Sequence, residues 1–241
     1  RRITVSDNLF YLLTLLPSLP NLGEPLTPED AMAKIREESD AGLLLLADLL
    51  DVENEIDKCA LHYYVQGSRE YTASLSERLP DSFHEMFASY HHRDEADWLT
   101  AIFAAWFELL LEVGDITGSG LLKEWAKWEY ALRTRLRIER LRAAGRLPAD
   151  VDTIVPEFMK ELSDLPDQHQ LVESARASAE PMKAEKMLDQ ARIDYLRRAV
   201  AQFSFSVDEL VAYMLELRIH QRYARLSPEK GRKLLEEVTR L

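Results

Sequence analysis

The chain has 241 residues and a single cysteine, Cys59, so it cannot form an internal disulfide or a cysteine-rich metal site, and it suits a reducing compartment. Its 8 glycines are about half the usual share, and apolar residues recur at spacings of three and four, which predicts an all-α protein. The formal net charge of −12 argues against nucleic-acid binding, because phosphate contacts require a positively charged surface.

The first predicted element is the apolar run at residues 9–16. A bilayer-spanning helix needs about 20 apolar residues, so we expect a buried core element, strand or helix, and no direct membrane insertion. After a proline-rich loop, Thr27 and Pro28 are a typical cap and first position of a helix. The apolar stretch at 43–50 predicts a core helix, followed by a turn and another short helix that ends before Gly67.

Two helices are predicted in the middle of the chain. Ser82 and Glu85 have the spacing of a capping box, and the apolar stripe that follows ends at Gly114. The segment 114–120 predicts a turn, and residues 121–144 predict a helix of roughly 35 Å. Four tryptophans at core spacing favour packing over a ligand cage: Trp98, Trp106, Trp125 and Trp128.

Residues 163–181 are polar and contain Pro166 and Pro181, which predicts a surface loop or a loosely packed helix. We place a module boundary there. N-terminal and middle helical modules would occupy 1–162, and a C-terminal module at 182–241 would pack on them.

The C-terminal module has clear helix signals. A helix is predicted over 182–203, and Ser206 with Glu209 forms a second capping box before an apolar face. Ser227 and Pro228 predict the start of a last helix.

A helical phrase occurs twice, 87 positions apart, beginning at Glu129 and at Glu216. Duplication of a helical module and chance similarity between two amphipathic helices explain this recurrence equally well. Each glutamate has a partner one turn on, Arg133 and His220 respectively. The two pairs are either buried ion pairs that join helices or exposed helical pairs.

Charge is unevenly distributed. Residues 29–58 hold ten acidic and three basic residues, and 123–146 hold eight basic and three acidic. Arg133, Arg137 and Arg140 project from the basic helix. They could bind an acidic partner, or they could be solvated or paired with the acidic first third of the chain.

Residues that could bind a metal are clustered at one place in the sequence, residues 91–95. His92, Asp94 and Glu95 could approach one ion, although such a run is usually solvated surface. The sequence has no phosphate-binding glycine loop and no hydrolase or metalloprotease motif. We therefore expect no catalytic residues, no metal and no cofactor.

Three stretches carry a family resemblance: Phe10–Pro25, Leu122–Arg133 and Val211–Leu217. The first resembles the start of a bacterial family associated with V-type ATPase operons. The other two are similar to helical signatures of the rotary-ATPase C subunit, also called d. The resemblance covers most of the chain in scattered motifs.

This resemblance implies a funnel-like arrangement of repeated helical-bundle modules and a non-catalytic role. Such a subunit couples the central stalk to the membrane rotor ring and transmits torque for ion transport. Its expected partners are stalk subunits D and F and the rotor ring, on the cytoplasmic face of the cell membrane. The residues expected to form the partner interface or pack the modules are Trp125, Trp128, Glu129, Arg133, Arg137, Arg140, Glu216, His220 and Arg222.

Two other functions stay open from the sequence. One is a helical adaptor that binds another protein through the basic helix. The other is a metal-dependent helical enzyme that uses His92, Asp94 and Glu95.

Overall fold

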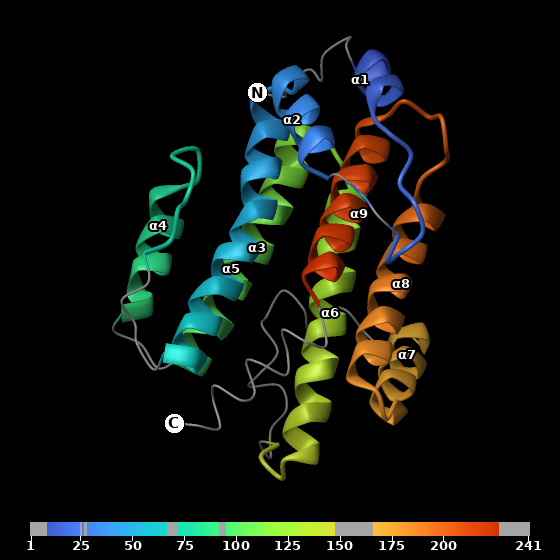
Figure 1. Ribbon diagram of the computed structural model, residues 1–241. Coiled ribbons are helices and arrows are strands. Elements are labelled where there is room, and N and C mark those ends of the chain that lie inside the picture. Colours follow the sequence, from blue (N-terminus) through green and yellow to red (C-terminus); the bar gives the residue numbers. More distant parts are fainter. Residues whose placement is uncertain are drawn as a thin grey trace.

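A computed structural model describes residues 9–24, 26, 28–66, 72–91, 95–147 and 166–226. Within these ranges the chain forms helices and no strands (Figure 1), which confirms the all-α prediction. No helix in the described ranges is long and apolar enough to cross a membrane. The elements are α1 (Leu9–Leu15), α2 (Pro28–Glu38), α3 (Ala41–Gln66), α4 (Asp81–Ala88), the 3₁₀ turn η1 (Ser89–His91), α5 (Glu95–Thr117), α6 (Gly120–Ala143), α7 (Pro166–Ala177), α8 (Pro181–Ala199) and α9 (Val207–Arg225).

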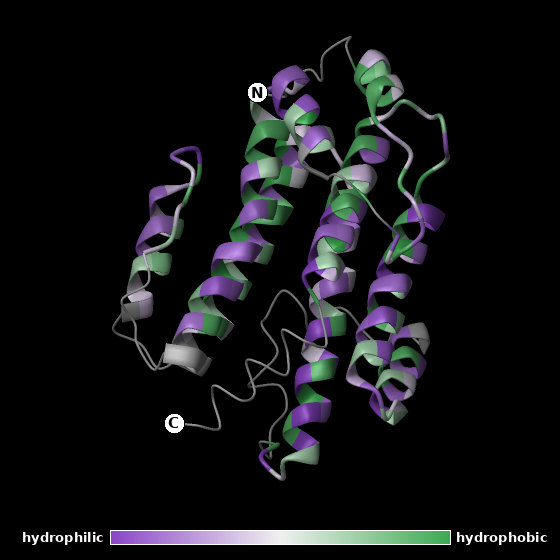
Figure 2. Ribbon diagram, in the orientation of Figure 1, coloured by the Kyte–Doolittle hydropathy of each residue, from purple (hydrophilic) through white to green (hydrophobic). Residues whose placement is uncertain are grey.

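Five long helices make up the body of the molecule. α5 and α6 form one antiparallel hairpin and α8 and α9 form another, and α6 packs against α9 so that the second helices of the two hairpins run side by side (Figure 1). α3 packs on α5 and α9, while α1, α2, α4 and α7 lie at the periphery. Hydrophilic positions are frequent along α8 and the later part of α6 (Figure 2).

The main hydrophobic core lies where α3, α5, α6 and α9 meet. Trp98 and Trp106 are fully buried on α5, and Trp125 of α6 is 5% exposed. Trp106 Nε1 donates a 2.8 Å hydrogen bond to the Leu49 carbonyl of α3. Trp128 is half-buried and stacks on Tyr195 of α8 at 4.7 Å. Core packing of the tryptophans is thus confirmed, with Trp128 at its edge.

The apolar run at residues 9–16 forms α1, but the expectation that it would be buried was wrong. Only Leu12 is buried, whereas Phe10 is 59% exposed and Tyr11 is 54% exposed. The helix has two turns and contacts α2 and α9 along one side, where Leu9 and Leu13 are partly buried against the core, while Phe10 and Tyr11 face outward.

α3 is one continuous helix, so the turn and second helix expected after residue 50 are not formed. The acidic stretch after Leu50 keeps the helix because its side chains lie at the surface or in ion pairs. Asp51, for example, accepts a 2.8 Å hydrogen bond from Arg36. Acidic residues in a helix interior carry little penalty when they are solvated or paired.

The predicted capping box at Ser82 was also wrong. α4 begins one residue earlier, at Asp81, and Pro80 stands at the N-cap without a side-chain hydrogen bond. Ser82 therefore lies inside the first turn. At Ser206 the serine cap is confirmed, because Ser206 Oγ accepts a 3.2 Å hydrogen bond from the Glu209 amide. The Glu209 carboxylate accepts from the amides of Phe203 and Phe205, so the reciprocal half of the predicted capping box is replaced by contacts to the preceding loop.

Gly114 does not end a helix, since α5 continues to Thr117. Its backbone approaches α6 so closely that a Cβ atom there would lie 2.6 Å from Lys123 Cγ. The chain turns instead at Gly118, which has a positive φ of 74°. Gly114 thus permits close helix packing.

Much of the segment expected as a loop or loosely packed helix, 163–181, is α7. Val172 and Ala175 of this helix are buried and form a small second cluster with Leu132 and Leu188. Most of its polar residues face solvent, which made the segment resemble a loop, although Gln168 is buried and donates a 2.8 Å hydrogen bond from Nε2 to the Trp128 carbonyl. The predicted last helix after Ser227 lies outside the described residues.

Candidate functional site

The second helices of the two hairpins, α6 and α9, begin in the same way. Ser119 caps α6 by accepting a 3.0 Å hydrogen bond from the Leu122 amide, and Ser206 caps α9 equivalently. The cap serines are 87 positions apart, the same interval that separates Glu129 from Glu216. Each glutamate therefore occupies the same place in its helix. This common register supports the view that α6 and α9 are equivalent elements of repeated modules.

Both glutamates are buried, with relative exposures of 1% for Glu129 and 6% for Glu216. Glu129 accepts a 2.8 Å hydrogen bond from Arg133 Nε, one turn along α6. It also accepts two from the Arg192 guanidinium of α8, at 2.8 and 2.9 Å. Of the two possibilities left open by the sequence, Glu129 fits the buried ion pair that joins helices.

Glu216 also binds an arginine of α8. Arg197 Nε lies 3.1 Å from both carboxylate oxygens, and Arg197 Nη2 bonds Oε1. His220 Nε2 lies 3.7 Å from Glu216 Oε1, which is too long for a hydrogen bond. α8 therefore provides one arginine to each of the two buried glutamates.

The contacts around Glu129 extend into a connected set that we call the ion-pair network. Arg133 bonds Glu53 of α3 as well as Glu129. Arg192 donates to Asp189 at 3.0 Å, and Arg222 of α9 bonds Asp189. The network joins α3, α6, α8 and α9, and its members are Glu53, Glu129, Arg133, Glu185, Asp189, Arg192 and Arg222.

Burial and charge oppose each other in this network. Burial alone would raise the pKa of Glu53, but the guanidinium groups of Arg133 and Arg218 outweigh it and lower the pKa to about 2. Glu129 follows the same pattern, with its pKa lowered by Arg192 and Arg133. The pKa of Asp189 is raised because burial outweighs the attraction of Arg222. The network is thus anchored by ionised glutamates.

A groove of 470 Å³, lined in part by members of the network, opens between α3, α5, α6, α8 and α9. We call it the arginine groove. Its floor contains Arg133, whose guanidinium lies over the Phe103 ring at 4.9 Å. Arg137 is half-buried and Arg140 exposed on its wall, and neither forms an ion pair with any residue that the structure describes.

The structure divides the nine residues that the sequence singled out. Glu129, Arg133 and Arg222 meet in the ion-pair network, and Arg137 and Arg140 line the groove beside it. Trp125 is buried in the core and lines a small cavity together with Glu129 and Arg133. The others are separate from this site: Trp128 stacks on Tyr195, and Glu216 and His220 lie beside Arg197.

Sequence reasoning missed the partners on the other helices. Glu185, Asp189 and Arg192 recur at spacings of four and three, which places them on one face of α8. That spacing was a usable signal of a polar face turned toward another helix. The possibility that arginines of the basic helix pair with the acidic first third of the chain is confirmed for Arg133, which bonds Glu53, 80 positions away. Helical spacing did not indicate which acidic residue would be the partner, because the contact depends on how the helices pack.

The candidate metal ligands fall largely outside the part of the chain that the structure describes. His92 and Asp94 lie outside the described residues, as does the side chain of Glu95. Elsewhere in the described ranges, no group of three or more His, Cys, Asp or Glu residues could hold a metal ion.

Comparison with known proteins gave one match. The model of the family described as "Protein of unknown function (DUF2764)" matches residues 47–241, which include α5, α6, α7, α8, α9 and most of α3. No curated protein and no solved structure matches the chain.

Proposed function

The chain belongs to this family, DUF2764, and we propose that it is a non-catalytic central-stalk subunit of a V/A-type rotary ATPase. In this role it couples the stalk to the membrane rotor ring and transmits torque for ion transport. It would act on the cytoplasmic face of the cell membrane, held there by its partners, the stalk subunits D and F and the ring. The sequence resemblance of α6 and α9 to the C subunit motivates the proposal.

The arginine groove is the structural observation that best supports a role in binding a partner protein. Arg137 and Arg140 lie one turn apart on α6 and form no ion pair with the residues that the structure describes, in a chain whose net charge is −12. An acidic helix of a partner could bind there, with Phe103 and Leu99 providing an apolar wall. Complementary charge of this kind sets orientation and association rate.

The ion-pair network supports a mechanical role. A subunit that transmits force must not let its helices slide past one another. Glu129 links α6 to α8 through Arg192, and Asp189 links α8 to α9 through Arg222. Buried charged hydrogen bonds are directional and costly to break, so they fix the relative positions of these helices.

Co-elution with purified D and F subunits from the same organism tests the proposal. We expect a one-to-one complex that persists at moderate salt. The double variant Arg137→Glu with Arg140→Glu should weaken binding at least tenfold without changing the unfolding midpoint. The matched control is Arg198→Glu, a charge reversal at an exposed position of α8 outside the arginine groove.

Absence of binding at low and moderate salt would contradict the stalk role. The alternative would then be a helical adaptor that uses the same groove for a protein unrelated to a rotary ATPase. Equal binding by the double variant and the wild type would show that the groove is not the interface.

A further inference from the structure

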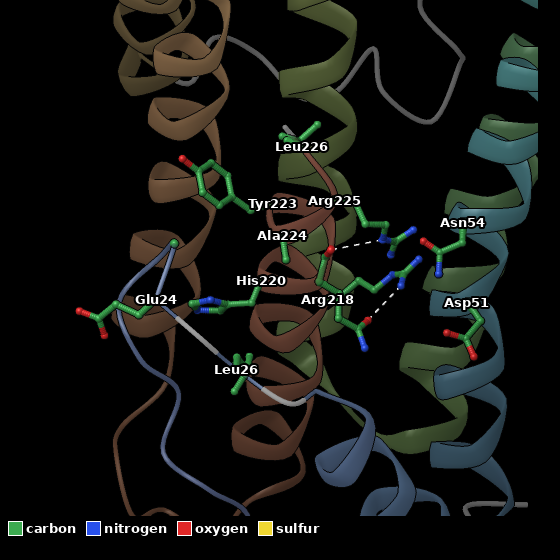
Figure 3. A pocket seen from close by; sticks show the side chains of 12 residues that line it. Glu24, Leu26, Asp51, Asn54, Arg218, His220, Tyr223, Ala224, Arg225 and Leu226 are labelled. Atoms are coloured by element: carbon green, nitrogen blue, oxygen red, sulfur yellow. Dashed lines mark hydrogen bonds between the residues drawn. The ribbon is translucent and has the colours of Figure 1, made fainter. Parts of the chain in front are cut away.

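A second cleft, of 810 Å³, lies between α9, α3 and the loop before α2. Figure 3 shows Arg218 and Arg225 extending from α9 toward Asn54 and Asp51 of α3. His220 and Tyr223 extend from the opposite side of α9 in the same view. The part of the cleft between α3 and α9 is therefore lined by two guanidinium groups.

Arg218 is an unusual buried cation. It is 8% exposed, and its Nη1 donates a 3.0 Å hydrogen bond to Gln221 Oε1. Its Nε atom is buried and has no hydrogen-bond partner, and it forms no ion pair with a described carboxylate. A guanidinium stays protonated in proteins, so this buried charge lacks a direct counter-charge.

The acidic residues of α3 do not provide that counter-charge by contact. Asp51 is bound to Arg36 at 2.8 Å, and Glu53 is bound to Arg133. Burial lowers the pKa of Arg218, and the like charge of Arg225 lowers it further, whereas the negative charges of Glu53, Asp51 and Asp57 oppose this without direct contact. The site favours an additional negative group.

Gln221 holds the two arginines in place. Its side-chain oxygen accepts from Arg218, and its carbonyl oxygen accepts a 3.2 Å hydrogen bond from Arg225 Nε. The terminal nitrogens of Arg225 form no hydrogen bond with the residues that the structure describes, so their N–H groups can donate to a ligand. They face the cleft together with Arg218 (Figure 3).

We propose that this cleft is an oxyanion-binding site, in which Arg218 and Arg225 together bind the carboxylate or phosphate group of a small molecule. Guanidinium groups bind both anions through paired N–H donors. Asn54 offers an amide on the opposite wall. The volume of 810 Å³ suits a small-molecule ligand. This binding does not depend on any ATPase partner.

Calorimetric titration of the full chain with succinate, and separately with inorganic phosphate, tests the site. We expect saturable one-to-one binding of at least one probe at low ionic strength, and the probe that binds identifies the ligand class. Arg218→Met should weaken that binding at least tenfold and Arg225→Gln severalfold. Arg198→Gln, on exposed α8 outside this cleft, should leave it unchanged.

Unfolding without ligand separates a binding role from a structural one. If Arg218 awaits an anion, Arg218→Met should have a denaturation midpoint at least equal to that of the wild type, and the binding probe should raise the midpoint of the wild type alone. Saturable binding of neither probe, or equal binding by wild type and Arg218→Met, would overturn the proposal. A lower midpoint for Arg218→Met would do so as well. Arg225 is exposed, so Arg225→Gln provides a folded variant in any case.

Discussion

Ser119 Oγ donates a 2.6 Å hydrogen bond to Asp208 Oδ1, which joins the first turn of α9 to the N-cap of α6. Asp208 also accepts a 3.2 Å hydrogen bond from the Leu121 amide, one of the free donors at the start of α6. One carboxylate therefore connects the beginnings of the two equivalent helices. Its negative charge is placed favourably with respect to both helix dipoles.

We expect Asp208→Ala to destabilise the protein by about 1–2 kcal/mol, because Ser119 loses a partner and the N-terminus of α6 loses a cap. Urea unfolding followed by far-ultraviolet circular dichroism measures this. The control is Asp115→Ala, which removes an exposed ion pair with Lys123 and should change stability by less than about 0.5 kcal/mol. Equal effects of the two substitutions would contradict the capping role.

Glu129→Ala should destabilise the protein by about 3–5 kcal/mol, because Arg133 and Arg192 would keep buried charges without their shared carboxylate. Chemical denaturation gives the free energy of unfolding. Glu124→Ala is the matched control on the same helix, since its pair with Lys127 is exposed. A Glu129→Ala protein with unchanged stability would mean that the ion-pair network contributes nothing to folding.

Acid unfolding should depend on Glu53. Its pKa is about 2 in the folded protein against an ordinary value of 4.5, so its stabilising contribution is complete above pH 4.5 and is lost as the pH falls toward 2. Glu53→Gln should therefore flatten the stability profile between pH 4.5 and 2. The exposed Glu112→Gln should reproduce the wild-type profile. A Glu53→Gln profile as steep as that of the wild type would show that other groups govern acid unfolding.

Cys59 should resist thiol reagents in the folded protein. It is 1% exposed on α3, and burial raises the pKa of its thiol to about 12, so almost no thiolate forms at pH 8. Labelling of Cys59 with a chromogenic disulfide reagent should be slow in buffer and stoichiometric in denaturant. Rapid labelling of the native protein would mean that α3 opens readily around this position.

The sequence predicted the helices better than their ends. The start of α6 was placed closely because a glycine-containing turn precedes regular apolar spacing, and the start of α9 because Ser206 is a typical cap before an apolar face. The boundary at Gly114 was misjudged because a glycine that allows two helices to approach looks the same in sequence as one that ends a helix. α7 was expected as loop or loose helix because only a few of its residues, such as Val172, are buried.

The site was predicted in part for a similar reason. Pairs within one helix, such as Glu129 with Arg133, follow from spacing alone. The partners that complete the network come from other helices, and Arg192 is 63 positions from Glu129. Such contacts depend on how helices pack, which periodicity does not specify.

Because α8 provides one arginine to each of two buried glutamates, the number of residues between those arginines is constrained. Arg192 reaches Glu129 and Arg197 reaches Glu216. Inserting one residue between these arginines would rotate the rest of α8 by about 100°, so at most one of them could keep its glutamate. Related sequences should therefore accept insertions and deletions before α8 or after it, but keep the interval between these two arginines constant.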